Sequence, residues 1–593
     1  MKRNEIKESL KWNVEKIYQT DEKFYEQAKK LEDLIDKVVK MKGHLTDDAD
    51  SFYEFLQKEE KALRLLYKIR TYAHLKNDED TRKSEYQQMD QYSQNLHSKL
   101  SEAFSFIDPE ILSAPKEKIE TFIEKKPELK EYKQYFDNLF RAKEHTLSEK
   151  EEKIIASYSK LENNPVNTYM LFSNADISFK DAKKDGKEVK ITEANFTDLQ
   201  EDENREFRKE VYENYYSSYK QFENTAASLL DGELKANNIK AKLKNFKSAR
   251  QMSLFANNID EKVYDNLIKT VNDNMDIMHD YTKLRKKVLG VDQLHFYDVY
   301  MPLVKSFDKK YSFDQAKEIV LEALKPLGDE YVEIAKKGFE DRWFDVCPNE
   351  GKRSGAYSSG CYDSDPYILL NYTNNLDSIF TVAHELGHSM HSYLTRNTQP
   401  FVYGSYSIFL AEIASTTNEL LLLDYLIKNA QNTDQKAYLL NYYMHSFKST
   451  VYRQTMFAEF EHEVNKLIWD DKPLSASILD KIYKDLNQKY FGEAMEVDDF
   501  IATEWARIPH FYMFYYVYQY ATGFCSAVYF SQKILHGSDE DREKYLGFLK
   551  AGESDYALNV LKDAGLDMTN PKPLEDALNV ARKTLKELEE MIG

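Results

Sequence analysis

Apolar residues recur at helical spacing along most of the chain. The first clear example consists of Leu31, Leu34, Ile35, Val38 and Val39. Charged residues occupy the positions between them, so this segment predicts an amphipathic helix. Similar patterns fill most of residues 48–159, and another ends the chain over residues 574–592. The pattern as a whole predicts a mainly α-helical fold.

Two segments interrupt this pattern and predict short β-structure. Residues 177–191 alternate apolar and polar side chains around Asp185-Gly186, which is a hairpin signal. Farther along, glycines and serines gather in residues 351–360 and precede a strand-like run over 367–372. Strand, turn and helix therefore follow one another in the middle of the chain.

Helical patterning resumes near residue 201, after the predicted hairpin. We therefore expect an N-terminal helical domain over residues 1–200 and a second domain over residues 201–593. No Pro- or Ser-rich linker separates the two, so we expect them to pack together.

Composition agrees with a helical, globular protein. Among 593 residues there are only 18 glycines and 13 prolines, against averages of about 7% and 5%, so helix breakers are scarce. The net charge of −19 disfavours nucleic acid as a partner, because such proteins gather Lys and Arg on their surface. Three cysteines without a C-x-x-C pair favour a reducing compartment, and the N-terminus does not read as a secretory signal.

Residues 508–530 contain no Asp, Glu, Lys or Arg and need a membrane test. They include Pro509, His510, Gln519 and several tyrosines, whereas a bilayer span prefers aliphatic residues with aromatics at its ends. We predict a buried aromatic helix of a soluble protein here, and no membrane partner.

The most specific chemical signal is the sequence His384-Glu385-Leu386-Gly387-His388. Helical residues four apart lie on one face, so two imidazoles at this spacing can converge on one metal ion. The glutamate between them lies beside the ion and can take a proton from water. The motif predicts a metal hydrolase, and its apolar neighbours predict a buried helix.

A catalytic zinc needs a third protein ligand. His391 lies about 10 Å along the helix from His384, so both cannot reach one ion, and we expect it to be packed or hydrogen-bonded behind the site. Glu412 is the better candidate because it has an apolar setting, and residues 399–407 can turn its helix across the first. Glu419, two turns farther on, can hydrogen-bond a ligand histidine. The alternative for Glu412 is an ordinary surface carboxylate.

Several separated blocks resemble the thimet-oligopeptidase-like family of zinc metallopeptidases, in its oligoendopeptidase F branch. These blocks are Lys352–Tyr357, Phe380–Met390, Ala411–Ser415, Arg507–Phe530, Ala551–Tyr556 and Ala564–Met568. The resemblance covers residues 200–590 well and the N-terminal part mainly in its helical character. It implies a two-lobed helical fold with a deep central channel and a small β-sheet beside the active-site helix, and it makes residues 201–593 the catalytic domain.

The same resemblance implies a site and an activity. One Zn²⁺ per chain would be held by His384, His388 and Glu412, with Glu385 as general base on a zinc-bound water. The implied reaction is hydrolysis of internal bonds in short, unstructured oligopeptides, and the implied location is the cytoplasm. Two rivals stay open: a related zinc carboxypeptidase or dipeptidase, and a catalytically inactive peptide-binding protein.

Further residues have an implied role in binding or catalysis. The resemblance implies that His510 and Tyr518 donate hydrogen bonds to the oxyanion and that Tyr515 contacts substrate, although plain core packing is the alternative for any single tyrosine. Gly355 and Ala356 are candidates for pairing with a substrate backbone at a strand edge, with a simple turn as the alternative.

Overall fold

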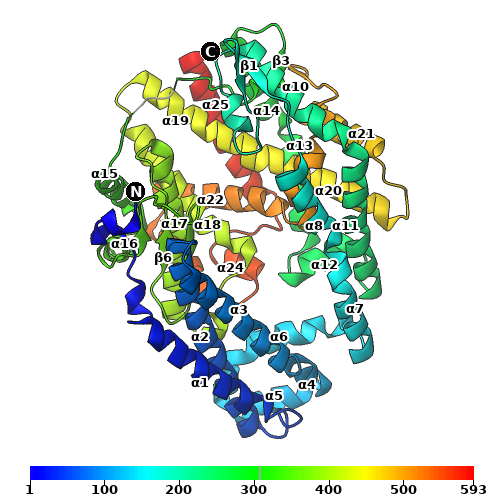
Figure 1. Cartoon of the computed structure of the whole chain (residues 1–593), viewed down its shortest axis with the longest axis vertical. Coiled ribbons are helices and arrows are strands. Elements are labelled where there is room, and N and C mark those ends of the chain that lie inside the picture. Colours follow the sequence, from blue (N-terminus) through cyan, green and yellow to red (C-terminus); the bar gives the residue numbers. More distant parts are fainter. Residues whose placement is uncertain (306–308) are drawn as a thin grey trace. The chain divides into compact units, whose positions relative to one another are not determined.

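The computed structural model describes residues 1–305 and 309–593 and is mainly helical, as predicted (Figure 1). The chain forms two compact units, each built from three separate segments. Unit 1 comprises Met1–Glu144, Asp308–Tyr425 and Phe530–Gly565, and unit 2 comprises His145–Phe307, Leu426–Tyr529 and Leu566–Gly593. The predicted domain boundary at residue 200 lies inside the first segment of unit 2, and a division there stays a prediction.

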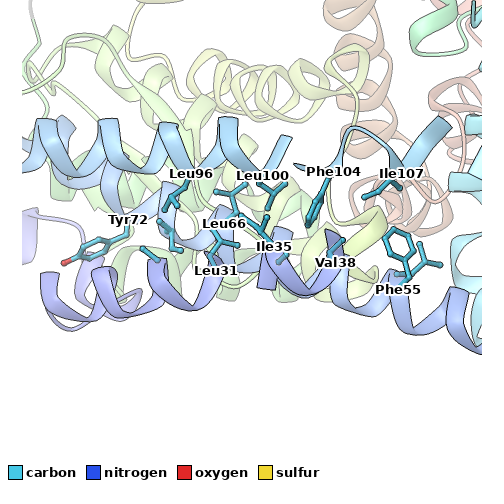
Figure 2. Close-up of a cluster of buried hydrophobic side chains, with 14 of the residues drawn as sticks. Leu31, Ile35, Val38, Phe55, Leu66, Tyr72, Leu96, Leu100, Phe104 and Ile107 are labelled. Carbon is cyan, nitrogen blue, oxygen red and sulfur yellow. The ribbon is translucent and has the colours of Figure 1, made fainter. Parts of the chain in front are cut away.

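Three long helices near the N-terminus build a large part of the core of unit 1. They are α1 (Asp21–Val39), α2 (Ala49–Glu79) and α3 (Ser84–Phe104). The apolar stripe predicted for the first of them points into this core, where Leu31, Ile35 and Val38 meet side chains of the other two helices (Figure 2). The Thr20 side chain accepts the N–H of Lys23, so the first turn of α1 is capped.

The remaining helices can be located by their bounds. Unit 1 also holds α4 (Ile107–Ser113), α5 (Lys116–Lys125), α6 (Lys133–Arg141), α15 (Phe313–Ala323), α16 (Asp329–Glu340), α17 (Leu376–Thr398), α23 (Asp539–Ala551) and α24 (Ala557–Asp563). Unit 2 holds α7 (Glu149–Glu162), α8 (Asn164–Leu171), α9 (Phe196–Leu199), α10 (Arg205–Gln221), α11 (Glu223–Leu243), α12 (Ala249–Ala256), α13 (Glu261–Asp273), α14 (Met275–Leu289), α19 (Thr433–Ser446), α20 (Arg453–Trp469), α21 (Ala476–Phe491) and α25 (Lys572–Ile592). Two helices, α18 (Ile408–Lys428) and α22 (Tyr518–His536), run from one unit into the other.

A small sheet packs against α17, as predicted. Its strands are β4 (Phe344–Asp345), β5 (Tyr357–Ser359) and β6 (Tyr367–Leu369), in the order β4-β6-β5. Strand β6 occupies the first half of the predicted run and pairs antiparallel with β5, with Ser358 opposite Ile368. Strand β5 therefore forms an outer edge of this sheet beside the helix of the H-E-x-x-H motif.

The predicted hairpin is present, but its strands cover fewer residues than the alternating segment 177–191. Strands β1 (Ala182–Lys184) and β2 (Lys187–Val189) pair antiparallel. Asp185 and Gly186 have φ angles of 51° and 76°, the left-handed conformation that a tight hairpin turn needs. A second small pair, β3 (Leu294–His295) and β7 (Met495–Glu496), is parallel.

The prediction of one aromatic helix over residues 508–530 is wrong in its first half. Pro509 opens a short 3-10 turn, and α22 begins only at Tyr518. Between them Tyr515 adopts φ 49°, and its N–H donates to the buried carboxylate of Glu461 at 2.6 Å instead of to a helical carbonyl. Across the described part of the chain, every helix is too short or too polar to cross a bilayer.

Candidate metal centre

Helix α17 places the two motif histidines on one face. It begins where the Asn375 side chain accepts the N–H of Ser378, and most of its length is buried. The ring centroids of His384 and His388 lie 4.8 Å apart, one helical turn from each other. Because the helix is packed on several sides, both rings have restricted directions in which to point.

The glycine inside the motif allows a second helix to cross at close range. A Cβ atom on Gly387 would lie 2.6 Å from the Cα of Ser415 and 2.8 Å from the carbonyl oxygen of Ala414. Any larger residue would force these backbones apart. The crossing brings Glu412, on α18, to the two histidines of α17.

These three side chains form a possible metal site. Glu412 Oε2 lies 3.5 Å from His384 Nε2 and 3.7 Å from His388 Nε2, and the three ligand atoms are all within 4.8 Å of one another. Tetrahedral zinc bonds of about 2.0–2.1 Å separate neighbouring ligand atoms by about 3.3 Å. The trio therefore fits a zinc ion after small side-chain shifts, and its two nitrogens and one carboxylate suit zinc chemistry.

Each of the three side chains is oriented by a further contact. His384 Nδ1 is hydrogen-bonded to Glu419 Oε1, as predicted, and the His388 ring bonds the backbone carbonyl of Ala411. Ser415 Oγ donates to Glu412 Oε2 at 3.2 Å. Such contacts fix the ring tautomer and leave the other nitrogen of each histidine able to bind a metal ion.

Neighbouring charges shift the pKa values of the two histidines in opposite directions. Burial tends to lower the pKa of His384, but the hydrogen bond and charge of Glu419 outweigh it and raise this pKa to about 9. Burial and the neighbouring His384 lower the pKa of His388 to about 4. A neutral His388 is ready to donate its lone pair to a metal, and the negative Glu419 increases the basicity of His384.

Glu385 has the environment of a general base. Its residue is only 7% exposed, and burial raises its pKa to about 7. The backbone N–H of Ser358, on β5, hydrogen-bonds its carboxylate and orients it. A cation bound by the nearby trio would lower this pKa and keep the carboxylate ready to accept a proton.

His391 is packed behind the site rather than placed in it. It is fully buried, and its ring stacks on Tyr406 with centroids 3.7 Å apart and planes 4° apart. Neither ring nitrogen has a hydrogen-bond partner within residues 1–305 and 309–593. Burial lowers its pKa to about 3, so the ring is neutral and acts as an aromatic packing group.

The other predicted residues lie outside this trio. Gly355 has φ 82°, its carbonyl accepts from Asn371 at 2.8 Å, and Ala356 follows it directly before the outer strand β5. Their pairing with substrate stays a prediction.

The predicted oxyanion donors belong to unit 2. His510 Nε2 lies 3.3 Å from the hydroxyl of Tyr520, and the ring of Tyr518 packs 5.2 Å from that of Tyr264. The Tyr515 hydroxyl lies 3.3 Å from His462 Nδ1. The roles of His510, Tyr515 and Tyr518 stay predictions.

Comparison with known proteins identifies the class. The model of peptidase family M3 matches residues 198–580, and the oligopeptidase F model matches residues 110–179. The oligopeptidase PepF of Bacillus subtilis is 46% identical over 591 residues, covering 100% of this chain and 88% of the relative. The group B oligopeptidase PepB of Streptococcus agalactiae is 43% identical and covers 100% and 98%.

A solved structure agrees with this assignment. The oligoendopeptidase-F of Enterococcus faecium superposes with a TM-score of 0.75 at 38% identity, over 96% of this chain and 99% of that one. The fold and the site define a metalloendopeptidase. The chain belongs to peptidase family M3, which confirms the resemblance seen in its sequence.

Proposed function

We propose that this protein is a zinc-dependent endopeptidase that cleaves internal bonds of short, unstructured oligopeptides. The observation that carries the proposal is the convergence of His384, His388 and Glu412 beside a buried Glu385. The names of its relatives support oligopeptides as the substrate class.

The proposed reaction assigns each step to a residue of the site. Zn²⁺, when bound, polarises a substrate carbonyl and lowers the pKa of a water towards about 7. Glu385 accepts the proton of the attacking water on its carboxylate. It then delivers that proton to the nitrogen of the leaving amine, so the base of the first step is the acid of the second. The hydrogen bond from Ser358 N–H holds this carboxylate in one orientation during both transfers.

We propose that the protein binds its substrate through hydrogen bonds to the peptide backbone rather than through contacts with particular side chains. Strand β5 is an outer strand of its sheet and carries the N–H that orients Glu385. An extended peptide can pair with such an edge, and Gly355 and Ala356 leave room for its approach. Only an unfolded segment has a free backbone to pair in this way, which favours short peptides, and Tyr515 is a further candidate contact.

Tyr518 and His510 are proposed to donate hydrogen bonds to the oxyanion. We expect Tyr518→Phe to reduce kcat about 10²-fold or more with little change in KM, because the lost donor acts on charge that develops only in the transition state. Tyr512→Phe is the matched control, since its ring stacks on Tyr169 at 4.3 Å and the variant loses only a hydroxyl. Steady-state kinetics on one fluorogenic peptide makes the measurement. Equal kcat values for the two variants would remove Tyr518 from the mechanism.

The activity itself is tested by mass spectrometry of a mixed peptide digest. We expect internal cuts in peptides of mid length, no cuts in a folded protein, and loss of all cuts when a chelator removes the metal. Products shortened by one or two residues from an end would identify the carboxypeptidase or dipeptidase rival. Retained peptide binding without cleavage in zinc-loaded protein would identify an inactive binding protein.

We also propose a cytoplasmic location. Cys347, Cys361 and Cys525 are all free thiols, as is usual in a reducing compartment. Cell fractionation with an antibody tests this, and recovery of the protein outside the cytoplasm would contradict it.

A further inference from the structure

A lysine is buried in a widened helical turn of unit 2, whereas the proposed metal ligands belong to unit 1. Lys448 lies in the π-helical segment Phe447–Tyr452, which links α19 to α20, and its residue is 6% exposed. Among the described residues its ammonium nitrogen has one hydrogen bond, a long one of 3.4 Å to the carbonyl oxygen of Val299. The ring of Tyr300 lies 5.6 Å away. Segments of π-helix occur frequently at functional sites.

A second buried basic side chain, Arg285, binds the same loop as Lys448, residues 298–301. Arg285, on α14, is 4% exposed and donates from Nη2 to the carbonyls of Asp298, at 2.9 Å, and Met301, at 2.6 Å. Its Nε is buried and has no partner within the described residues. The turn 298–301 therefore anchors both Lys448 and Arg285 through backbone carbonyls, which carry no full negative charge.

No carboxylate of the described chain neutralises this pair. Asp298 is the acid on the turn, and its two oxygens are taken by Arg205, at 2.8 Å, and Arg208, at 2.7 Å. No Asp or Glu oxygen among residues 1–305 and 309–593 lies within ion-pair distance of Lys448 or Arg285. Two buried cations without a counterion are costly in a medium of low polarity.

The neighbouring groups complete a set of donors. Burial, together with Arg285 and Arg453, lowers the pKa of Lys448. The charge of Lys448 and burial lower the pKa of His445, one helical turn before it, so the imidazole is neutral and can donate an N–H. An anion beside these groups would favour the charged ammonium of Lys448 and would use the free Nε–H of Arg285.

We propose that Lys448 and Arg285 form a binding site for one small singly charged anion, chloride or a carboxylate group, in unit 2. The site is independent of peptide cleavage and of the metal ligands. It offers an ammonium and a guanidinium N–H from two helical segments held on one turn, with a tyrosine ring beside them.

Thermal unfolding at constant ionic strength tests the site in the full-length protein. When a bulky sulfonate buffer anion is replaced by chloride, or in a second series by acetate, we expect a saturable rise in Tm of about 2–5 °C. Lys448→Met should abolish the rise, because it removes the ammonium and keeps a side chain of similar length. A rise with chloride identifies an inorganic anion, and a rise with acetate alone identifies a carboxylate; either supports the site.

Lys436→Met is the matched control. It removes one positive charge from α19, where Lys436 is half-exposed and pairs with Glu587 at 2.6 Å, so nonspecific salt effects change equally in the two variants. Crystals of the unaltered protein soaked in bromide give a second readout, with an anomalous peak expected beside Lys448 Nζ and Arg285 Nε. A Tm that rises with neither anion, an absent bromide peak although chloride raises the Tm, or an undiminished Tm rise in Lys448→Met, overturns the proposal.

Discussion

Replacement of Glu385 by Gln is expected to reduce kcat by about 10³-fold or more while the protein still binds one zinc ion. The amide keeps the size of the side chain and its contact with Ser358, but it cannot accept a proton from water at neutral pH. The proposed metal ligands His384, His388 and Glu412 are unchanged, so the metal content should equal that of the unaltered protein. Peptide cleavage and metal analysis of the same preparation make the two measurements.

The matched control is Glu553→Gln, another glutamate of unit 1 that lies outside the ligand trio. This variant should keep near-normal kcat, because it makes the same chemical change at a residue that belongs neither to the ligand trio nor to the proposed general base. Near-normal turnover by Glu385→Gln would end the general-base assignment. Loss of zinc together with loss of turnover would instead mean that the carboxylate supports the metal site.

Much of this centre could be predicted from sequence because it depends on local helical geometry. The spacing of His384 and His388 fixes a shared face, and the rise per residue excludes His391 from the same ion. An apolar setting singled out Glu412, and a two-turn offset singled out Glu419 as the partner of His384, which the structure shows. Each of these inferences depends only on the geometry of one helix, or of one helix and the turn before it.

The missed contacts depend on how distant segments meet. Ser358 orients Glu385 through a backbone N–H, and a backbone group has no sequence signal of its own. Gly387 sits at the helix crossing, and its signal was visible as a glycine inside an otherwise strong helix, which usually has a packing reason.

The aromatic segment shows a limit of hydropathy patterns. Its lack of charges predicts one continuous helix, but the N–H of Tyr515 donates to the carboxylate of Glu461, more than fifty residues earlier in the chain. Tyr515 then occupies the left-handed region, which costs a non-glycine residue about 1–2 kcal/mol and interrupts the helix. Such a partner can be identified only after the fold brings α20 and this loop together.

Two glutamates of α18 should respond differently to the same substitution. Glu412→Gln replaces the proposed third metal ligand by a neutral amide and is expected to abolish stoichiometric zinc binding and activity together. Glu419→Gln keeps an oxygen acceptor for His384 Nδ1 but removes the negative charge that raises the pKa of this histidine. It should weaken zinc binding about 10–100-fold, which corresponds to about 1.4–2.7 kcal/mol.

Competition with a zinc indicator measures both affinities, and activity at saturating zinc separates the two roles. Glu419→Gln should recover most of its kcat once the site is filled, because its side chain orients a ligand without touching the ion. Glu412→Gln should not recover at any zinc concentration that leaves the protein folded, since two histidines alone hold the metal poorly. Equal losses in the two variants, or full recovery of Glu412→Gln, would contradict the assignment of Glu412 as the third ligand.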